Sequence, residues 1–132
     1  GAEAVHDGMW ESAKRLDEEL RGTVAGHLAP GGACEGLGLT LCGHSLGAGV
    51  ASLLSLRWRG EFPGIRAFAI APPCTMSETL AGEMRGLVTS VVLGDDAVCR
   101  WSVGSTKDAL ASAAALAREG GAVRRCVAAA LQ

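Results

Sequence analysis

Apolar residues recur every three or four positions along one long stretch of the chain, and a second stretch is apolar over most of its length. The first stretch runs from Val5 to Leu28, has charged residues on its other faces, and is followed by Pro30 and two glycines. The second covers residues 46–58 and is rich in small side chains. This spacing places apolar side chains on one side of a helix, while proline and glycine end helices. Two helices are therefore predicted, one in each stretch.

Two further helices are predicted from N-terminal capping signals. Thr75 stands three residues before Glu78, which is the spacing of a capping box, and a short amphipathic segment follows. Ser105 stands three residues before Asp108, ahead of an alanine-rich segment. We expect a short helix after Thr75 and a longer one after Ser105.

Three short apolar runs separate the predicted helices, at residues 37–42, 65–70 and 87–93. Continuous apolar runs of this length are typical of strands that are buried on both faces. Strands that alternate with helices predict the α/β class, here a parallel sheet with helices on both faces and the three strands as neighbours. Cys42, in the first run, is expected to be a small core residue.

The composition narrows the functional classes. Apolar residues make up 48% of the 132 positions, enough for a buried core. The net charge is −2 and no basic patch occurs, so nucleic acid is not expected as a partner. No apolar run approaches the roughly 20 residues of a membrane span, so any membrane contact is expected to be peripheral or to come from sequence outside these 132 residues. The five cysteines are far apart, odd in number and include no C-x-x-C pair, so neither a zinc site nor a redox motif is expected, and a reducing compartment is favoured. No cofactor is expected.

The segment Gly43-His44-Ser45-Leu46-Gly47 lies between a predicted strand and a predicted helix. It matches G-x-S-x-G, the pattern of a nucleophile elbow, in which the serine occupies a tight strand-to-helix turn. In such a turn, a Cβ at Gly43 or Gly47 is expected to clash with neighbouring backbone. The turn exposes the Ser45 hydroxyl and directs the Leu46 backbone N–H toward a developing oxyanion. The alternative is a glycine-rich turn in which Ser45 only caps the helix.

A serine nucleophile needs a histidine base and a carboxylate that orients the histidine. In α/β-hydrolases these residues follow one another as serine, acid and histidine. Asp95 and Asp96 come directly after the third predicted strand. One of them is predicted to be the acid, at the same carboxyl edge of the sheet as Ser45. The alternative is an ordinary solvated turn.

Four segments strengthen this interpretation because they occur in the order of one family. They are His6-Asp7-Gly8-Met9, residues 43–49, Ala71-Pro72-Pro73 and residues 91–100. With them the chain resembles class 3 lipases, and among these the diacylglycerol lipase-like branch, over most of residues 5–110. The resemblance implies the α/β-hydrolase fold, Ser45 as the nucleophile, and Asp96 rather than Asp95 as the acid. Cys99 stands where the family usually has proline.

The base is missing from its expected place. The chain has three histidines, His6, His27 and His44, and all of them precede Asp96. His6 is the remaining candidate for a substitute base. The strand that supplies the second oxyanion donor in this fold is not found either. We therefore expect residues 1–132 to be a partial α/β-hydrolase domain that lacks the first strands and the C-terminal part.

The resemblance implies a lipase that cleaves acylglycerols, diacylglycerol among them, through an acyl-enzyme on Ser45. Lipid is then the expected substrate, with peripheral contact to a lipid interface. The chain by itself is expected to be inactive because it lacks the triad histidine. Two alternatives remain open. One is an esterase or thioesterase of the same fold, and the other is a non-catalytic pseudo-hydrolase that binds lipid or a partner protein.

Overall fold

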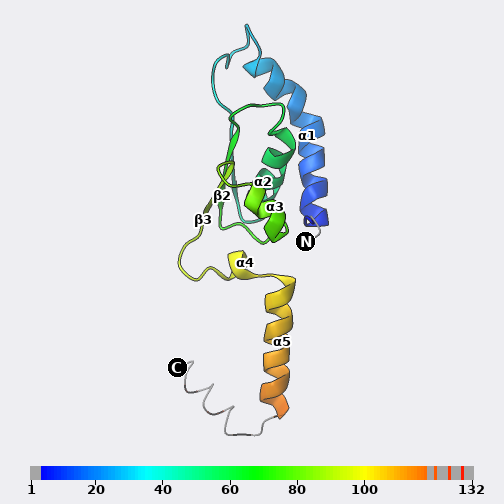
Figure 1. Cartoon of the computed structure of the whole chain (residues 1–132), viewed down its shortest axis with the longest axis vertical. Coiled ribbons are helices and arrows are strands. Elements are labelled where there is room, and N and C mark those ends of the chain that lie inside the picture. Colours follow the sequence, from blue (N-terminus) through cyan, green and yellow to red (C-terminus); the bar gives the residue numbers. More distant parts are fainter. Residues whose placement is uncertain (1–3, 119–120, 122–124, 126–128, 130–132) are drawn as a thin grey trace. The chain divides into compact units, whose positions relative to one another are not determined.

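The computed structural model describes residues 4–118 together with residues 121, 125 and 129. The chain divides into two compact units, residues 1–100 and residues 101–132, and each is described by itself (Figure 1). The second unit contains α5 (Val103–Arg118). The elements of the first unit are α1 (Asp7–Leu28), β1 (Thr40–His44), α2 (Leu46–Trp58), β2 (Arg66–Ile70), α3 (Glu78–Glu83), β3 (Val88–Val91) and α4 (Ala97–Arg100).

The three strands form one parallel sheet in the order β1-β2-β3. Pairing between β1 and β2 begins at Thr40 with Arg66 and ends at His44 with Ile70, and Ile70 also pairs with Val91 of β3. The prediction of three neighbouring parallel strands is confirmed. β3 is shorter than its apolar run because pairing stops where β2 stops, so the two apolar residues after Val91 leave the sheet. β1 begins later than its run and extends two residues past it, to His44.

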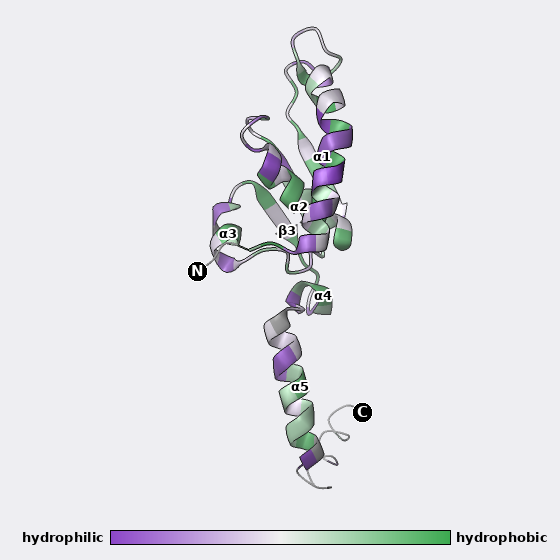
Figure 2. Cartoon of the chain, turned by 90° about the vertical axis from the view of Figure 1, so that its right-hand side faces the viewer, coloured by the Kyte–Doolittle hydropathy of each residue, from purple (hydrophilic) through white to green (hydrophobic). Residues whose placement is uncertain are grey.

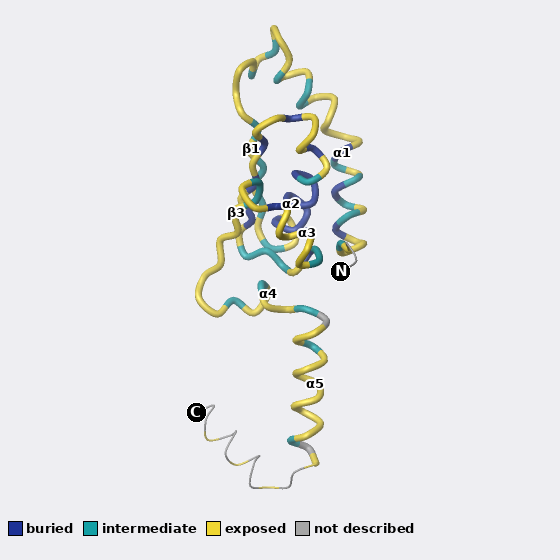
Figure 3. The backbone as a smooth tube through the Cα atoms, viewed as in Figure 1, coloured by how far each residue is buried: buried dark blue, intermediate teal, exposed yellow. Residues whose placement is uncertain are grey.

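Helix α2 packs on one face of this sheet, and α1 packs on α2 (Figure 1). Ala67 and Ala69 of β2 are buried, and their small side chains let α2 approach the sheet closely. Leu53 of α2 is completely buried, and Trp58, at the end of the same helix, is 2% exposed. Figure 3 shows α2 as the most continuously buried helix. Burying a side chain of this kind contributes about 1.5–3 kcal/mol, so α2 is the centre of the core.

Helix α1 is amphipathic, as predicted. Met9 and Ala13 are buried in the core, while charged residues occupy the outer side, where Figure 2 shows hydrophilic segments along the helix. The Nδ1 atom of His6 accepts the Met9 N–H at 3.5 Å and so caps the first turn. After Leu28 the backbone becomes extended. The predicted helix at residues 5–28 is confirmed, with its start two residues later.

The second face of the sheet carries exposed apolar side chains. Cys42 and Phe68 are in register on neighbouring strands, so they point to the same side, and both are exposed. Ile70 is exposed on that side as well. The α/β class is confirmed, but in the described part of the first unit α1 and α2 cover one face only. The expectation that Cys42 is a core residue is wrong, because alternate residues of β1 point away from α2.

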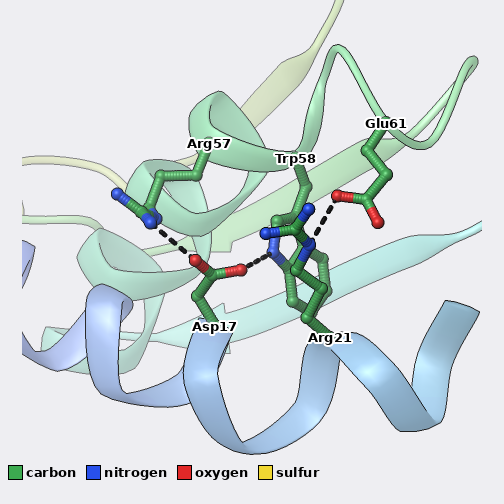
Figure 4. Close-up of polar contacts among 5 residues, drawn as sticks. All are labelled: Asp17, Arg21, Arg57, Trp58 and Glu61. Atoms are coloured by element: carbon green, nitrogen blue, oxygen red, sulfur yellow. Dashed lines mark hydrogen bonds and ion pairs between the residues drawn. The ribbon is translucent and has the colours of Figure 1, made fainter.

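A buried carboxylate joins α1 to α2 (Figure 4). Asp17 accepts hydrogen bonds from Arg57 Nη2 at 2.5 Å and from Trp58 Nε1 at 2.6 Å. These two hydrogen bonds, together with the positive charge of Arg57, hold the pKa of Asp17 below its ordinary value, although burial acts in the opposite direction. The Arg57 guanidinium also lies over the Trp10 ring, 5.1 Å from its centroid. Asp17 therefore ties the middle of α1 to the end of α2.

Two predicted helix starts lie elsewhere in the structure. The N-cap of α3 is Ser77 and not Thr75, which is buried. In the second unit the start of α5 is closed by Ser102, whose Oγ accepts the Ser105 N–H at 3.1 Å. Ser105 Oγ in turn accepts the Ser102 N–H at 2.8 Å, so Ser105 acts from inside the helix. Every helix among the described residues is too short or too polar to cross a membrane.

Candidate active site

Ser45 is the single residue between β1 and α2, and its backbone is strained. Its φ of 53° and ψ of −122° lie in a region that side-chain-bearing residues rarely adopt. Its carbonyl accepts the Ala48 N–H at 2.9 Å, which starts α2. Among the described residues its side chain makes no capping hydrogen bond to the helix. This observation argues against the alternative in which Ser45 only caps α2.

Gly43 makes the tight turn sterically possible. A Cβ at this position would overlap the Gly47 carbonyl group and lie 2.7 Å from the Ala48 nitrogen. The expectation for Gly47 itself is wrong, because a Cβ there meets no described atom within 4 Å, and its φ is not positive. The reason is directional. Gly43 faces the backbone of Gly47, whereas the missing Cβ of Gly47 points into open space.

Gly49 is a close-packing position that the sequence interpretation missed. A Cβ there would lie 2.6 Å from Met9 Sδ and 2.6 Å from Thr75 Cγ2. The first turn of α2 thus rests directly on α1 and on the loop after β2. The run of small residues at 47–49 was the available signal, but it does not reveal which of these positions is crowded.

The loop after β2 supports the turn from the side. The Ser45 N–H donates to the Ile70 carbonyl at 2.9 Å, and the Ala71 N–H donates to the Val91 carbonyl at 2.8 Å. Ala71 has a φ of 49°, which is unusual for alanine and costs about 1–2 kcal/mol. Pro72 follows and restricts the chain further. The carboxyl ends of β1, β2 and β3 are therefore linked by hydrogen bonds at the edge that carries Ser45.

Leu46 is the first residue of α2. The backbone N–H groups of a first helical turn have no partner within the helix, and they lie at the positive end of the helix dipole. The Leu46 N–H, adjacent to the Ser45 hydroxyl along the chain, is thus suited to stabilise negative charge that develops on a substrate oxygen. The Leu46 side chain is exposed.

Asp95 and Asp96 differ in their surroundings. The Asp95 side chain is fully exposed and lies 3.4 Å from Arg100 Nη2. Asp96 is half-buried, and its Oδ1 accepts the Val98 N–H at 2.8 Å. The Asp96 N–H donates to the Leu93 carbonyl at 3.3 Å. The backbone therefore orients the Asp96 carboxylate, while Asp95 is an ordinary surface residue.

The three histidines lie at different places in the first unit. His6 caps α1 and donates its backbone N–H to the Thr75 carbonyl at 2.8 Å. His27 lies exposed in the last turn of α1, and His44 is the exposed last residue of β1. Among the described residues no histidine forms a hydrogen bond with Ser45. Among the described residues, Ser45 and the Asp96 carboxylate therefore lie at the ends of β1 and β3 without a histidine hydrogen-bonded to either.

A cavity of about 290 Å³ lies beside the carboxyl edge of the sheet, between α2, α3 and β3. Pro72 and Cys74 line it near the carboxyl ends of the strands, and Met84 and Val88 line it toward the amino end of β3. Most of the side chains around it are apolar, so it suits a hydrocarbon group better than a charged one. In the part of the chain that the structure describes, no group of three or more potential metal ligands occurs.

Comparison with known proteins agrees with this geometry. Residues 2–105 match the family model described as lipase (class 3). Human diacylglycerol lipase-alpha is 39% identical over 100 residues, which span 72% of this chain and 10% of that protein. Mouse diacylglycerol lipase-beta is 44% identical over 71 residues, spanning 53% of this chain and 11% of that protein. The chain thus covers about a tenth of the length of these relatives.

Solved structures give the same fold. A lipase from Rhizopus microsporus var. chinensis superposes with a TM-score of 0.69 at 17% identity, covering 80% of this chain and 38% of that one. The N225Q mutant of MDLA from Penicillium cyclopium has a TM-score of 0.67 at 24% identity, covering 80% and 39%. At these identities the likeness supports the α/β-hydrolase fold.

Proposed function

The chain belongs to the class 3 lipase family, and from this premise we propose that it carries the nucleophile and the acid of a serine hydrolase that cleaves acylglycerol esters. Diacylglycerol is the substrate class that the relatives favour, since two of them are named diacylglycerol lipases. The single observation that carries the proposal is the conformation of Ser45. Its backbone between β1 and α2 is strained, and among the described residues its hydroxyl makes no capping hydrogen bond to α2.

The proposed reaction begins with attack of Ser45 Oγ on the ester carbonyl carbon. A base takes the hydroxyl proton, and negative charge develops on the carbonyl oxygen, where the Leu46 N–H stabilises it. The tetrahedral intermediate then expels the glycerol oxygen as an alcohol and leaves an acyl group on Ser45. Water attacks this acyl-enzyme in the second half of the reaction, releases the fatty acid and restores Ser45.

Asp96 is proposed as the carboxylate that orients the base. Its half-buried position and its hydrogen bond from the Val98 N–H support this role over Asp95, whose side chain is fully exposed. The base is a histidine that the described residues do not bring to Ser45. Residues 1–132 alone should therefore hydrolyse esters at background rates. Loss of a triad member lowers turnover by about 10⁴ to 10⁶ in serine hydrolases.

Contact with a lipid interface is proposed at the same edge of the sheet. Leu46, Ile70, Val91 and Leu93 stand at or just beyond the carboxyl ends of the strands, and all four side chains are exposed. We call these four residues the apolar rim. An exposed group of large apolar side chains beside a catalytic serine fits an enzyme whose substrate lies in a lipid surface. This arrangement favours a lipase over an esterase for small soluble esters.

The test is hydrolysis by the full-length protein of emulsified diacylglycerol and of a short soluble ester, each with the wild type, Ser45→Ala and Ser12→Ala. We expect strong preference for the emulsion, loss of at least about 10³-fold with Ser45→Ala, and unchanged activity with Ser12→Ala, on the outer side of α1. Preference for the soluble ester would instead favour an esterase. No hydrolysis of either ester by a folded wild-type protein would favour the pseudo-hydrolase.

A further inference from the structure

Two cysteines that are far apart in sequence meet beside Asp96. The Cys74 thiol, in the loop after β2, donates to the backbone carbonyl of Cys99 in α4, with 3.6 Å between Sγ and oxygen. Both thiols are free, Cys74 is exposed, and Cys99 is half-buried. The fold therefore brings together a pair of thiols that no C-x-x-C motif in the sequence predicts.

The surroundings give the two thiols different reactivities. Partial burial, the negative charge of Asp96 and a hydrogen bond to its carboxylate raise the pKa of the Cys99 thiol. A charge on Cys74 acts in the same direction, which reflects how near the two sulfur atoms are. The nucleophile in thiol oxidation is the thiolate, and access to the oxidant also matters. Cys74 is thus placed to react first, and Cys99 second.

We propose that Cys74 and Cys99 form an oxidisable pair, which a hydroperoxide converts into a disulfide that joins the loop after β2 to α4. A thiol aimed at the Cys99 backbone lies within side-chain reach of the Cys99 sulfur. We therefore expect rotation about the two Cα–Cβ bonds to bring the sulfurs to bonding distance. Cys42, also exposed, lies on the open face of the sheet and serves as a matched control.

The chemistry balances with one hydroperoxide per pair. The Cys74 thiolate attacks the terminal peroxide oxygen, an S–O bond forms, and the O–O bond breaks to release an alcohol, or water if the oxidant is hydrogen peroxide. The Cys99 thiolate then attacks the Cys74 sulfur, the S–S bond forms, and the S–O bond breaks to release water. The two thiols lose two electrons and two protons, and the peroxide takes up both.

The disulfide changes the environment of Asp96, a consequence that rests on the proposed function. In the reduced chain the Cys99 thiol is a hydrogen-bond partner of the Asp96 carboxylate. A disulfide sulfur has no proton to donate, so oxidation frees that side of the carboxylate for an imidazole N–H. It also restrains α4, the helix that follows Asp96 directly. Oxidation therefore acts on the acid of the triad and leaves Ser45 unchanged.

The test is peptide mapping after treatment with hydrogen peroxide. Trypsin cuts after Arg85, so Cys74 lies in peptide 67–85 and Cys99 in peptide 86–100, while Cys42 lies in peptide 22–57. After peroxide treatment, alkylation and digestion, we expect peptides 67–85 and 86–100 joined with the loss of two hydrogen atoms, and Cys42 alkylated. Before oxidation, Cys74 should be alkylated about tenfold faster than Cys99.

Variants separate this proposal from the proposed function. Cys74→Ser and Cys99→Ser should each abolish the joined peptides, whereas Cys42→Ser and Ser45→Ala should keep them. Circular dichroism establishes that each variant is folded. Failure of the wild type to form the joined peptides, or pairing of Cys74 with Cys42 instead, would overturn the thiol pair. That result would leave Ser45 chemistry untouched, because the assay does not measure hydrolysis.

Discussion

The strained backbone of Ser45 persists because its neighbours hold it from both sides. A residue in a sparsely populated region of φ/ψ space costs about 1–3 kcal/mol. The Ser45 N–H is bonded to the Ile70 carbonyl, and the Ser45 carbonyl accepts the N–H groups of Ala48 and Gly49. Gly43 adds no atom where the turn closes. These contacts place the hydroxyl at the end of β1, ahead of the first turn of α2.

The first prediction contrasts the two glycines of the turn. Gly43→Ala should destabilise the chain by about 3 kcal/mol or more, since the new Cβ meets backbone atoms that cannot rotate away. Gly47→Ala should be neutral or stabilising by up to about 1 kcal/mol, because it adds a helix-favouring residue in open space within α2. Urea-induced unfolding measures both. Equal losses would contradict the account of the turn.

Residue-level prediction from sequence succeeded where chemistry depends on residue type and order. Ser45 as the turn residue follows from G-x-S-x-G between a strand and a helix. The expected clash at Gly47 was wrong, because the direction in which a Cβ would point depends on the path of the backbone. Residue-level prediction also missed Gly49, whose neighbours Met9 and Thr75 come from distant parts of the chain.

At the scale of the elements, the buried carboxylate of Asp17 joins α1 to α2. Asp17 is buried at the interface, where Arg57 and Trp58 both donate to it. Nearby, Arg21 of α1 and Glu61, in the turn after α2, form an exposed ion pair at 2.6 Å. Exposed pairs contribute little, so Asp17 is the important member of this group (Figure 4).

The second prediction follows from the lowered pKa of Asp17. A carboxyl with a lower pKa in the folded state stabilises the fold above the ordinary aspartate pKa of about 4, and this stabilisation is lost as pH falls through the folded-state pKa. Asp17→Asn should therefore cost about 2–4 kcal/mol at pH 7, and its difference from the wild type should shrink below about pH 4. Urea unfolding over a pH series measures this difference.

Glu11→Gln is the matched control for Asp17. Glu11 pairs with Lys14 on the exposed side of α1 at 2.6 Å. Such a pair contributes at most about 0.5 kcal/mol, so this variant should follow the wild type at every pH. A pH-independent loss for Asp17→Asn would show that the carboxylate charge does not stabilise the α1–α2 contact.

Element boundaries were predictable where local residues set them. The helix at residues 46–58 matches α2 at both ends. Strand ends were less predictable, because pairing with a neighbour of five residues, β2, determines how far β1 and β3 extend. The Thr75 capping box failed because the chain uses Thr75 in the contact with Gly49, and Ser77 takes the N-cap position.

On the scale of the molecule, the exposed apolar residues are not uniformly spread. The apolar rim stands at the carboxyl ends of the strands, where Ser45 also lies. Leu93 is the most exposed member, at 90%. Leu37, which is 67% exposed, precedes the amino end of β1 and so lies on the side away from Ser45. A lipid surface that presents substrate to Ser45 should therefore meet Leu93 and not Leu37.

The third prediction uses this pair of leucines. Leu93→Asp should weaken binding of the chain to vesicles of zwitterionic lipid that contain diacylglycerol by about tenfold or more, because it places a charge where the exposed leucine is expected to enter the lipid surface. Leu37→Asp adds the same charge away from the rim and should change binding less than about twofold. Vesicle co-sedimentation measures both variants. Equal weakening would mean that the apolar rim does not define the lipid contact.

Long-range contacts account for most of what sequence reasoning did not find. The contact of Asp17 with Arg57 and Trp58 joins residues 40 and 41 positions apart. The contact between Cys74 and Cys99 spans 25 positions. No local pattern encodes such pairs, because they depend on how helices and loops pack. The parallel sheet could be predicted from the sequence because it depends on the periodicity of apolar residues. Ser45 and Asp96 could be singled out because they belong to motifs that occur in a fixed order along the chain.

The central claim is that Ser45 is the nucleophile, and labelling with a fluorophosphonate tests it most directly. The full-length protein is treated with the probe, digested with trypsin, and the modified residue is located by fragmentation of peptide 22–57, which also contains Ser52 and Ser55. We expect one phosphonylated residue, Ser45, with labelling abolished by Ser45→Ala and retained in Ser52→Ala and Ser55→Ala. Labelling of a different serine, or labelling that survives Ser45→Ala, would contradict this claim.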